Sequence, residues 1–249
     1  MARYFLELSY KGTRYKGFQV QLNADTVQGE VEKALAVILR EKITLTGSSR
    51  TDAGVHAWQN YFHFDYENEL SEKLLYNLNA VLPADIAAKN IIPVPDTAHA
   101  RFDAVGRRYR YVICREKDPF LQELAYYYPY SIDIEQLNRY ASELINHTDF
   151  TSFSKRNTQV KTFVCTVTES RWVWEDHCLV YYVQANRFLR GMVRALVATM
   201  LKAARRGVTV DGFNQLVEAR DCTQASFASP AHGLFLVSVN YPVGFLSQK

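Results

Sequence analysis

The chain has 249 residues, of which 48% are hydrophobic and 22% are charged, and its formal net charge is +3. This composition is ordinary for a folded protein of one large or two small domains, and no apolar run reaches the roughly 20 residues of a membrane-spanning helix. Residues 1–7 carry an acidic side chain where a signal peptide would be apolar. We therefore expect a cytoplasmic protein with no membrane partner.

The first half of the chain has patterns of both strands and helices. Alternating apolar side chains along residues 3–10 predict a strand. Asp25, with Gln28 three residues later, predicts the N-cap and capping box of a helix whose apolar stripe runs from Val27 to Ile38. The other elements expected in this half are two strands, at 43–47 and 55–64, and a helix from about 71 to 83.

Residues 92–106 are rich in proline and small side chains, so we take them as the connection between two halves, 1–105 and 106–249. In the second half we expect a strand, a helix, a hairpin, a long helix ending at Gly207, a short helix and a closing strand, at 107–115, 133–146, 163–186, 187–206, 211–220 and 233–242. Strands interrupted by helices favour an α+β fold, two α/β halves joined through a mainly antiparallel central sheet with helices packed on it.

The cysteines and glycines give no sign of a metal or a cofactor. None of the four cysteines forms a CxxC pair, and no histidine pair has metal-ligand spacing. No glycine-rich nucleotide-binding motif is present. We expect reduced, mostly buried thiols, and neither a cofactor nor a metal.

The segment RTDAG at 50–54 lies between two expected strands. Asp52, followed by a small residue and glycine, is on this feature alone most typical of a turn. Two observations favour a chemical role. Arg50 lies two residues earlier, where its cation favours the ionised carboxylate. The surrounding segment, GSSRTDAGVHA, is also far longer and more particular than a turn requires.

RTDAGVHA at 50–57 resembles the signature loop of the tRNA pseudouridine synthase A family. Six further segments resemble that family in the same order, at 9–21, 26–35, 99–113, 149–153, 188–197 and 232–242. Two departures concern finer RNA contacts. Two serines precede Arg50 where the family often has one small residue, and Gly191 and Ala195 stand where a histidine and an asparagine are common.

The resemblance implies the pseudouridine synthase fold and the isomerisation of uridine to pseudouridine at positions 38, 39 and 40 of the tRNA anticodon stem-loop. It implies no cofactor or metal, and a homodimer that grips one tRNA. Asp52 would be the essential carboxylate. Cleaving the glycosidic bond builds positive character at C1′, which a carboxylate stabilises or traps. Addition to C1′ and removal of the 2′ proton both remain open for Asp52.

The motif has no second acid to activate water as a glycosidase would, which suits a reaction that keeps water out. The target base must leave the RNA stack and then be held. By resemblance, Tyr109 packs on the target base and Arg50 occupies the active site. Arg194 and Leu234 line the pocket by the same resemblance. His56 follows Asp52 by four residues, but the strand expected from Val55 turns it away.

Three basic clusters interleaved with aromatic residues are compatible with an RNA surface or with solvated faces. Arg187, Arg190 and Arg194 have the spacing of one helix face, so we expect the first two to contact the RNA backbone. Lys155 and Arg156 are expected to join them.

Two other functions are compatible with parts of the sequence. A non-catalytic RNA-binding module would carry a ring-bearing motif such as that of the RRM, which is absent, and it leaves Asp52 unexplained. An aspartic protease would need two copies of the TDAG segment to share a proton, and the sequence has one.

Overall fold

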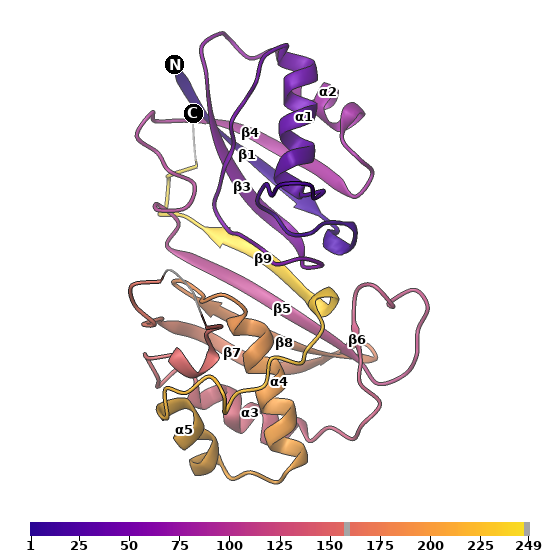
Figure 1. Cartoon of the computed structure of the whole chain (residues 1–249), viewed down its shortest axis with the longest axis vertical. Coiled ribbons are helices and arrows are strands. Elements are labelled where there is room, and N and C mark those ends of the chain that lie inside the picture. The colour runs from indigo at the N-terminus through magenta and orange to yellow at the C-terminus, as the bar shows by residue number, and fades with distance from the viewer. Residues whose placement is uncertain (157–159, 247–249) are drawn as a thin grey trace. The chain divides into compact units, whose positions relative to one another are not determined.

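The computed structural model describes residues 1–156 and 160–246. It divides into two compact units (Figure 1). Unit 1 comprises residues 1–105 and the C-terminal segment from Phe235, and unit 2 comprises Gly106–Leu234. The sequence division placed that C-terminal segment in the second half. It lies in unit 1 because its strand pairs with a strand of the first half.

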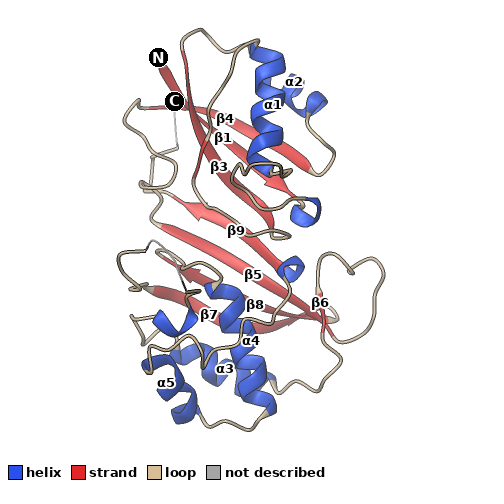
Figure 2. Ribbon diagram, viewed as in Figure 1, coloured by secondary structure: helices blue, strands red, loops and turns tan. Residues whose placement is uncertain are grey.

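Unit 1 is built on a mixed sheet. The central strands are β1 (Ala2–Tyr10) and β3 (His56–Tyr66), which are antiparallel. The other strands of unit 1 are β2 (Thr46–Gly47), β4 (Ile86–Val94) and β9 (Leu234–Asn240). β4 pairs with β1 and β2 with β3, while β9 runs parallel to β3. The helices α1 (Val27–Leu39) and α2 (Leu74–Val81) lie next to each other beside this sheet (Figure 2).

The N-cap of α1 is Thr26, so the predicted Asp25 cap is wrong by one residue. The Thr26 hydroxyl accepts a hydrogen bond from the amide of Gly29 at 3.2 Å, while Asp25 is exposed. Gln28 makes no capping box, because its side-chain amide donates to the carbonyl of Leu45 at 2.9 Å. The position of the helix is therefore set by the chain around it as well as by its own first turn.

Unit 2 contains a mainly antiparallel sheet with three helices packed beside it (Figure 2). Its strands β5 (Gly106–Cys114), β8 (Cys178–Ala185) and β7 (Val167–Glu175) lie in the order β5-β8-β7, and the short β6 (Tyr126–Tyr127) is parallel to β5. The helices are α3 (Ile134–Glu143), α4 (Met192–Arg205) and α5 (Val210–Glu218). Ten side chains of α4 are buried, which makes it the central helix of this unit. The predicted α+β class with mainly antiparallel pairing is confirmed.

The long helix begins at Met192 and not at 187 as predicted. Gly191 precedes it with φ of +74°, a left-handed conformation that L side chains rarely adopt. The helix therefore cannot extend toward the N-terminus past Gly191. Arg187 and Arg190 thus lie on the segment between β8 and α4. The prediction that they share a helix face with Arg194 is wrong.

Cys114 and Cys178 face each other across β5 and β8, with their Sγ atoms 2.9 Å apart, and all four cysteines are free thiols. Within residues 1–156 and 160–246, no three side chains of the metal-ligating types gather into a group. No helix in those ranges has both the length and the apolar composition needed to cross a bilayer.

Candidate active site

The RTDAG segment lies on the connection from β2 to β3 in unit 1. Thr51 is buried, Asp52 is half-buried and Arg50 is exposed. The loop thus presents the carboxylate of Asp52 near the surface while the residue before it is held in the interior. This arrangement suits a group that must meet a substrate.

Buried hydrogen bonds from β1 and β3 anchor the loop. The hydroxyl groups of Tyr10 and Thr51 lie 2.7 Å apart. The side-chain amide of Asn60 donates to the Tyr10 oxygen at 3.1 Å and to the carbonyl of Ser49 at 2.9 Å, and its own oxygen accepts from the hydroxyl of Ser48 at 2.8 Å. Asn60 is fully buried, so these bonds satisfy polar groups that would otherwise lose water without compensation.

The backbone on both sides of Asp52 is also held. The amide of Phe18 donates to the carbonyl of Thr51 at 3.1 Å, and the amide of Val55 donates to the carbonyl of Asp52 at 3.2 Å. Gly12 approaches so closely that a Cβ there would lie 1.9 Å from the Val55 oxygen. The segment after β1 and the Asp52 loop are therefore fitted together in a way that only glycine permits at this position.

His56 has a structural role in this arrangement. Its side chain is 1% exposed, its Nδ1 accepts a hydrogen bond from the amide of Gly12 at 2.9 Å, and its ring packs on Phe235. An Nδ1 that accepts this bond helps to hold the Gly12 segment against the loop. That His56 is not the general base stays a prediction.

In unit 2, Tyr109 lies half-buried in the middle of β5, opposite Val183 of β8. The Phe188 ring meets it edge to face, with ring centroids 5.1 Å apart. Arg108 and Arg110 point to the other side of the strand, since both guanidinium groups lie over the ring of Tyr182 at 4.5 and 5.9 Å. Tyr109 and the two arginines thus lie on opposite faces of β5, as the alternation of a strand requires.

The basic cluster formed by Arg101, Arg107, Arg108 and Arg110 is partly structural. Arg108 forms an ion pair with Glu169 at 2.7 Å, and Arg110 lies 3.4 Å from Glu175. The bond to Glu169 raises the pKa of Arg108, and Arg108 in turn holds the pKa of Glu169 below its usual range. These two arginines therefore stabilise the β5-β8-β7 sheet.

Arg194 lies in the first turn of α4 and is tied to the segment that leads into β9. Its Nε donates to the carbonyl of Ser229 at 2.9 Å, and the Ser229 hydroxyl donates to the Arg194 carbonyl at 2.7 Å. The Tyr111 hydroxyl donates to the next carbonyl, that of Pro230, at 2.8 Å. A Cβ at Gly233 would lie 2.8 Å from the Tyr111 ring, and the buried Leu234 follows directly.

The predicted RNA-backbone residues surround the start of α4. The amide of Lys155 donates to the carbonyl of Arg190 at 3.3 Å, and the Lys155 side chain passes close to Gly191. Arg187 is three residues before Arg190 in sequence, next to the Phe188 that contacts Tyr109. Arg156 is exposed, with its Nε 3.4 Å from the sulfur of Cys222.

The predicted site residues thus form two groups. Arg50 and Asp52 belong to unit 1, and Tyr109, Arg194 and Leu234 belong to unit 2.

The residues that hold these groups in place are not predicted by any motif of the sequence. Tyr10 and Asn60 support the Asp52 loop, and Ser229 fixes Arg194. The one signal for Asn60 was an amide within a strand rich in aromatic residues, because a buried amide needs partners. Ser229 lies in a segment without periodicity, and no comparable signal marks it.

The sequence matches the family model described as tRNA pseudouridine synthase over residues 8–103 and 141–242. The tRNA pseudouridine synthase A of Parabacteroides distasonis is 45% identical over 244 residues, which cover 97% of each chain. That of Bacteroides thetaiotaomicron is 42% identical over 253 residues, covering 100% of this chain and 94% of the relative. A Staphylococcus aureus protein of the same name is 38% identical over 240 residues, covering 95% and 90%.

Proposed function

Because the chain belongs to the tRNA pseudouridine synthase family, we propose that it isomerises uridine to pseudouridine at positions 38, 39 and 40 in the anticodon stem-loop of tRNA. The observation that supports this most strongly is the Asp52 loop. It offers one half-buried carboxylate on a backbone held from both sides. A rigid support of this kind keeps a reacting group in position during the reaction.

In the proposed reaction, the bond between N1 of uracil and C1′ of ribose breaks, and a bond between C5 and C1′ forms. Asp52 either adds to C1′ or removes the 2′ proton to permit the cleavage. The uracil turns within the pocket before it rejoins. C5 then loses its proton and N1 gains one, so the product is an isomer of the substrate and no co-reactant is consumed.

Tyr109 is proposed to stack on the flipped uracil, with Phe188 supporting its ring from the side. Arg50, exposed beside Asp52, is proposed to occupy the space that the nucleotide vacates. Arg194 and Leu234 are proposed as further walls of the pocket. The bonds from Ser229 and Tyr111 hold the chain around them in a defined position.

The proposed partner is tRNA, whose backbone would contact Arg187, Arg190, Lys155 and Arg156. We also propose that the protein works in the cytoplasm as a homodimer whose two chains grip one tRNA. Sedimentation of the free protein tests the dimer, with a mass of two chains as the expected result and a single-chain mass as the contradicting one.

Replacing Asp52 tests the proposed reaction. Asp52→Asn and Asp52→Ala should lower the rate of pseudouridine formation by several orders of magnitude, because the essential carboxylate is lost while the loop keeps its anchors. The measurement is release of tritium from tRNA labelled at C5 of uracil. Affinity for tRNA and the melting temperature should change little.

Asp25→Asn is the matched control, because it removes an exposed carboxylate of the same unit. This variant should turn over at the wild-type rate. An Asp52→Asn enzyme within tenfold of wild type would refute the role of Asp52. A wild-type protein that binds tRNA without releasing tritium would favour a non-catalytic RNA-binding module.

A further inference from the structure

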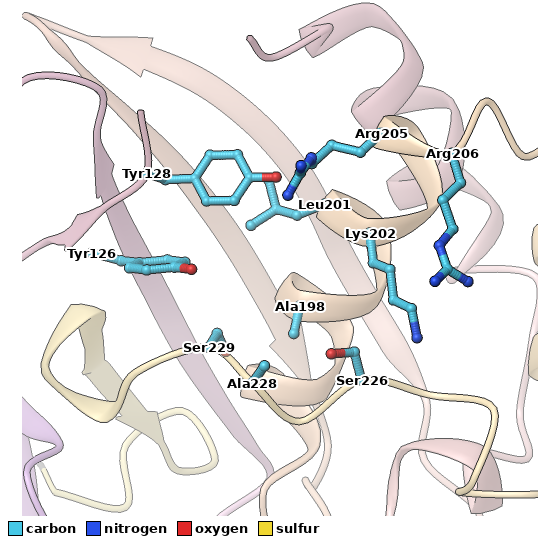
Figure 3. A pocket seen from close by; sticks show the side chains of 10 residues that line it. All are labelled: Tyr126, Tyr128, Ala198, Leu201, Lys202, Arg205, Arg206, Ser226, Ala228 and Ser229. Carbon is cyan, nitrogen blue, oxygen red and sulfur yellow. The ribbon is translucent and has the colours of Figure 1, made fainter. Parts of the chain in front are cut away.

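A hollow of about 370 Å³ lies in unit 2, beside the C-terminal half of α4 (Figure 3). Three parts of the chain enclose it: α4 itself, the tyrosines at and just after β6, and the segment 226–229. Its lining includes the cations Lys202, Arg205 and Arg206 and, among the described residues that line it, no carboxylate. The hollow is therefore suited to an anion.

Arg205 is held in place at the edge of this pocket. Its guanidinium lies over the ring of Tyr130, 3.8 Å from the centroid, and it bonds to the hydroxyl of Tyr128. Figure 3 shows that hydroxyl pointing toward the guanidinium. A cation fixed in this way loses little conformational freedom when it binds an anion.

Lys202 and Arg206 are exposed, and neither has an ion-pair partner among the residues that the structure describes. Cations near a helix C-terminus complement the helix dipole, and this explains why Lys202 and Arg206 stand at the end of α4. The dipole does not account for the fact that they line one hollow together with the hydroxyl groups of two tyrosines and two serines. Burial raises the pKa of Tyr126, so its hydroxyl keeps its proton and can donate a hydrogen bond.

The pocket adjoins the proposed RNA site. Ser229 lines it and also exchanges hydrogen bonds with Arg194. Arg194 and Lys202 are eight residues apart on α4, a rise of about 12 Å along the helix. The pocket thus lies within about 12 Å of Arg194 along this helix, near enough for one bound RNA to contact both places.

We propose that this pocket binds a phosphate group of the RNA substrate, on the strand that leads away from the target uridine. Lys202 and Arg206 neutralise the phosphate, while Arg205 and the Tyr126 hydroxyl, on the other side of the hollow (Figure 3), donate to the adjoining nucleotide, and the Tyr126 ring offers a face to its base. This assignment rests on the proposed function, since that function supplies the RNA.

The test is the salt dependence of tRNA binding by the double variant Lys202→Gln with Arg206→Gln. Glutamine keeps most of the length of these side chains and favours helix, so the fold should survive, with an unchanged melting temperature as the check. Each phosphate contact contributes roughly 0.7–0.9 to the slope of log affinity against log salt. The double variant should therefore bind about tenfold more weakly at low salt, with a slope shallower by about 1.

Lys42→Gln with Lys89→Gln is the control, because it removes the same charge from exposed positions of unit 1. This control should keep the wild-type slope. Equal slopes in the two double variants would overturn the assignment to RNA. If inorganic phosphate then binds wild type but not Lys202→Gln with Arg206→Gln, the pocket serves a free phosphate compound instead.

Tritium release by wild type, measured on the same tRNA, separates this inference from the proposed function. If wild type releases tritium and the two double variants have equal salt slopes, only the pocket is refuted. If the Lys202→Gln, Arg206→Gln variant has the shallower salt slope but wild type releases no tritium, the pocket is supported and the reaction is refuted.

Discussion

At the scale of single residues, Tyr109 allows stacking to be separated from proton transfer. Tyr109→Phe keeps the ring that we expect to pack on uracil, and it keeps the edge contact with Phe188. It removes a hydroxyl that could accept the proton leaving C5. We expect single-turnover rates about 10²-fold slower with tRNA affinity nearly unchanged, because general bases contribute on that order. Rapid mixing with labelled tRNA measures both quantities.

Tyr109→Leu is the companion variant, because it removes the ring as well. It should slow turnover equally and also weaken tRNA binding. A purely structural tyrosine would give another result: full activity for the phenylalanine variant, and only a lower melting temperature for the leucine variant, through a cavity. That result would remove Tyr109 from the pocket.

His63 makes the stability of unit 1 depend on pH. Its side chain is 7% exposed, and its Nδ1 accepts a hydrogen bond from the amide of Ala100 at 3.1 Å. Burial, with the nearby His99 and Arg3, lowers its pKa to about 4. An unfolded histidine titrates near 6.5. As the pH falls from about 6.5 to 4, the unfolded chain binds the proton first, so the folded state loses stability.

This loss amounts to about 2 kcal/mol between about pH 7 and pH 4.5. Urea denaturation at the two pH values measures it. In His63→Gln the difference in unfolding free energy between them should shrink by that amount. His177→Gln, which alters a largely exposed histidine, should leave it unchanged. An identical pH dependence in wild type and His63→Gln would contradict the assignment.

At the scale of elements, the segment that follows β1 holds the Asp52 loop through Gly12. In Gly12→Ala the added methyl group would meet the carbonyl of Val55, so one of the two segments must move. Displacing a reacting group by about 1 Å can cost about 10²-fold in rate. We expect that loss in tritium release, measured well below the melting temperature, together with a lower melting temperature.

Gly212→Ala provides the comparison. It also adds a methyl group, but the nearest atom, 3.1 Å away, belongs to the side chain of Val208 and can adjust. Alanine also favours the helix that contains this position. Activity should stay at the wild-type level. A Gly12→Ala enzyme of normal rate would show that the two segments can separate without moving Asp52.

Some elements could be predicted from the sequence and others could not. The apolar periodicity of α1 and the alternation of β5 were strong enough to predict both from local pattern. The start of α4 was not predictable in the same way, because the apolar pattern continues upstream through Phe188 and the left-handed conformation of Gly191 has no separate signal. β4 was missed because it lies at the edge of the unit 1 sheet, paired only with β1, and contains a proline.

The candidate site shows the same limit. Asp52 was found because its chemistry is concentrated in one short motif. Tyr10 and Asn60 reach that motif from strands distant in sequence, so their hydrogen bonds follow from the tertiary fold and from no local pattern.

At the scale of the whole molecule, the modest net charge of +3 hides a local concentration of cations before α4. Arg187→Gln with Arg190→Gln should weaken tRNA binding, and more so at low salt. The reason is that each phosphate contact releases counterions on binding, and this gain is lost with the contact. Filter binding across a range of salt concentrations measures this slope. The Lys42→Gln, Lys89→Gln control should match wild type. A slope equal to that of the control would make both arginines ordinary solvated surface.

The order in which the ribosome delivers the chain has a consequence for when the enzyme matures. Unit 2 is continuous from Gly106 to Leu234, so all its residues are available before synthesis ends. Unit 1 has to wait for β9, in which Phe235 and Leu236 pair with His56 and Ala57 directly after the Asp52 loop. A chain that stops near residue 234 would contain all of unit 2 and would lack the strand that pairs with β3 directly after the Asp52 loop. We therefore expect unit 2 to be able to fold before synthesis ends, and unit 1 to be complete only once β9 has been made.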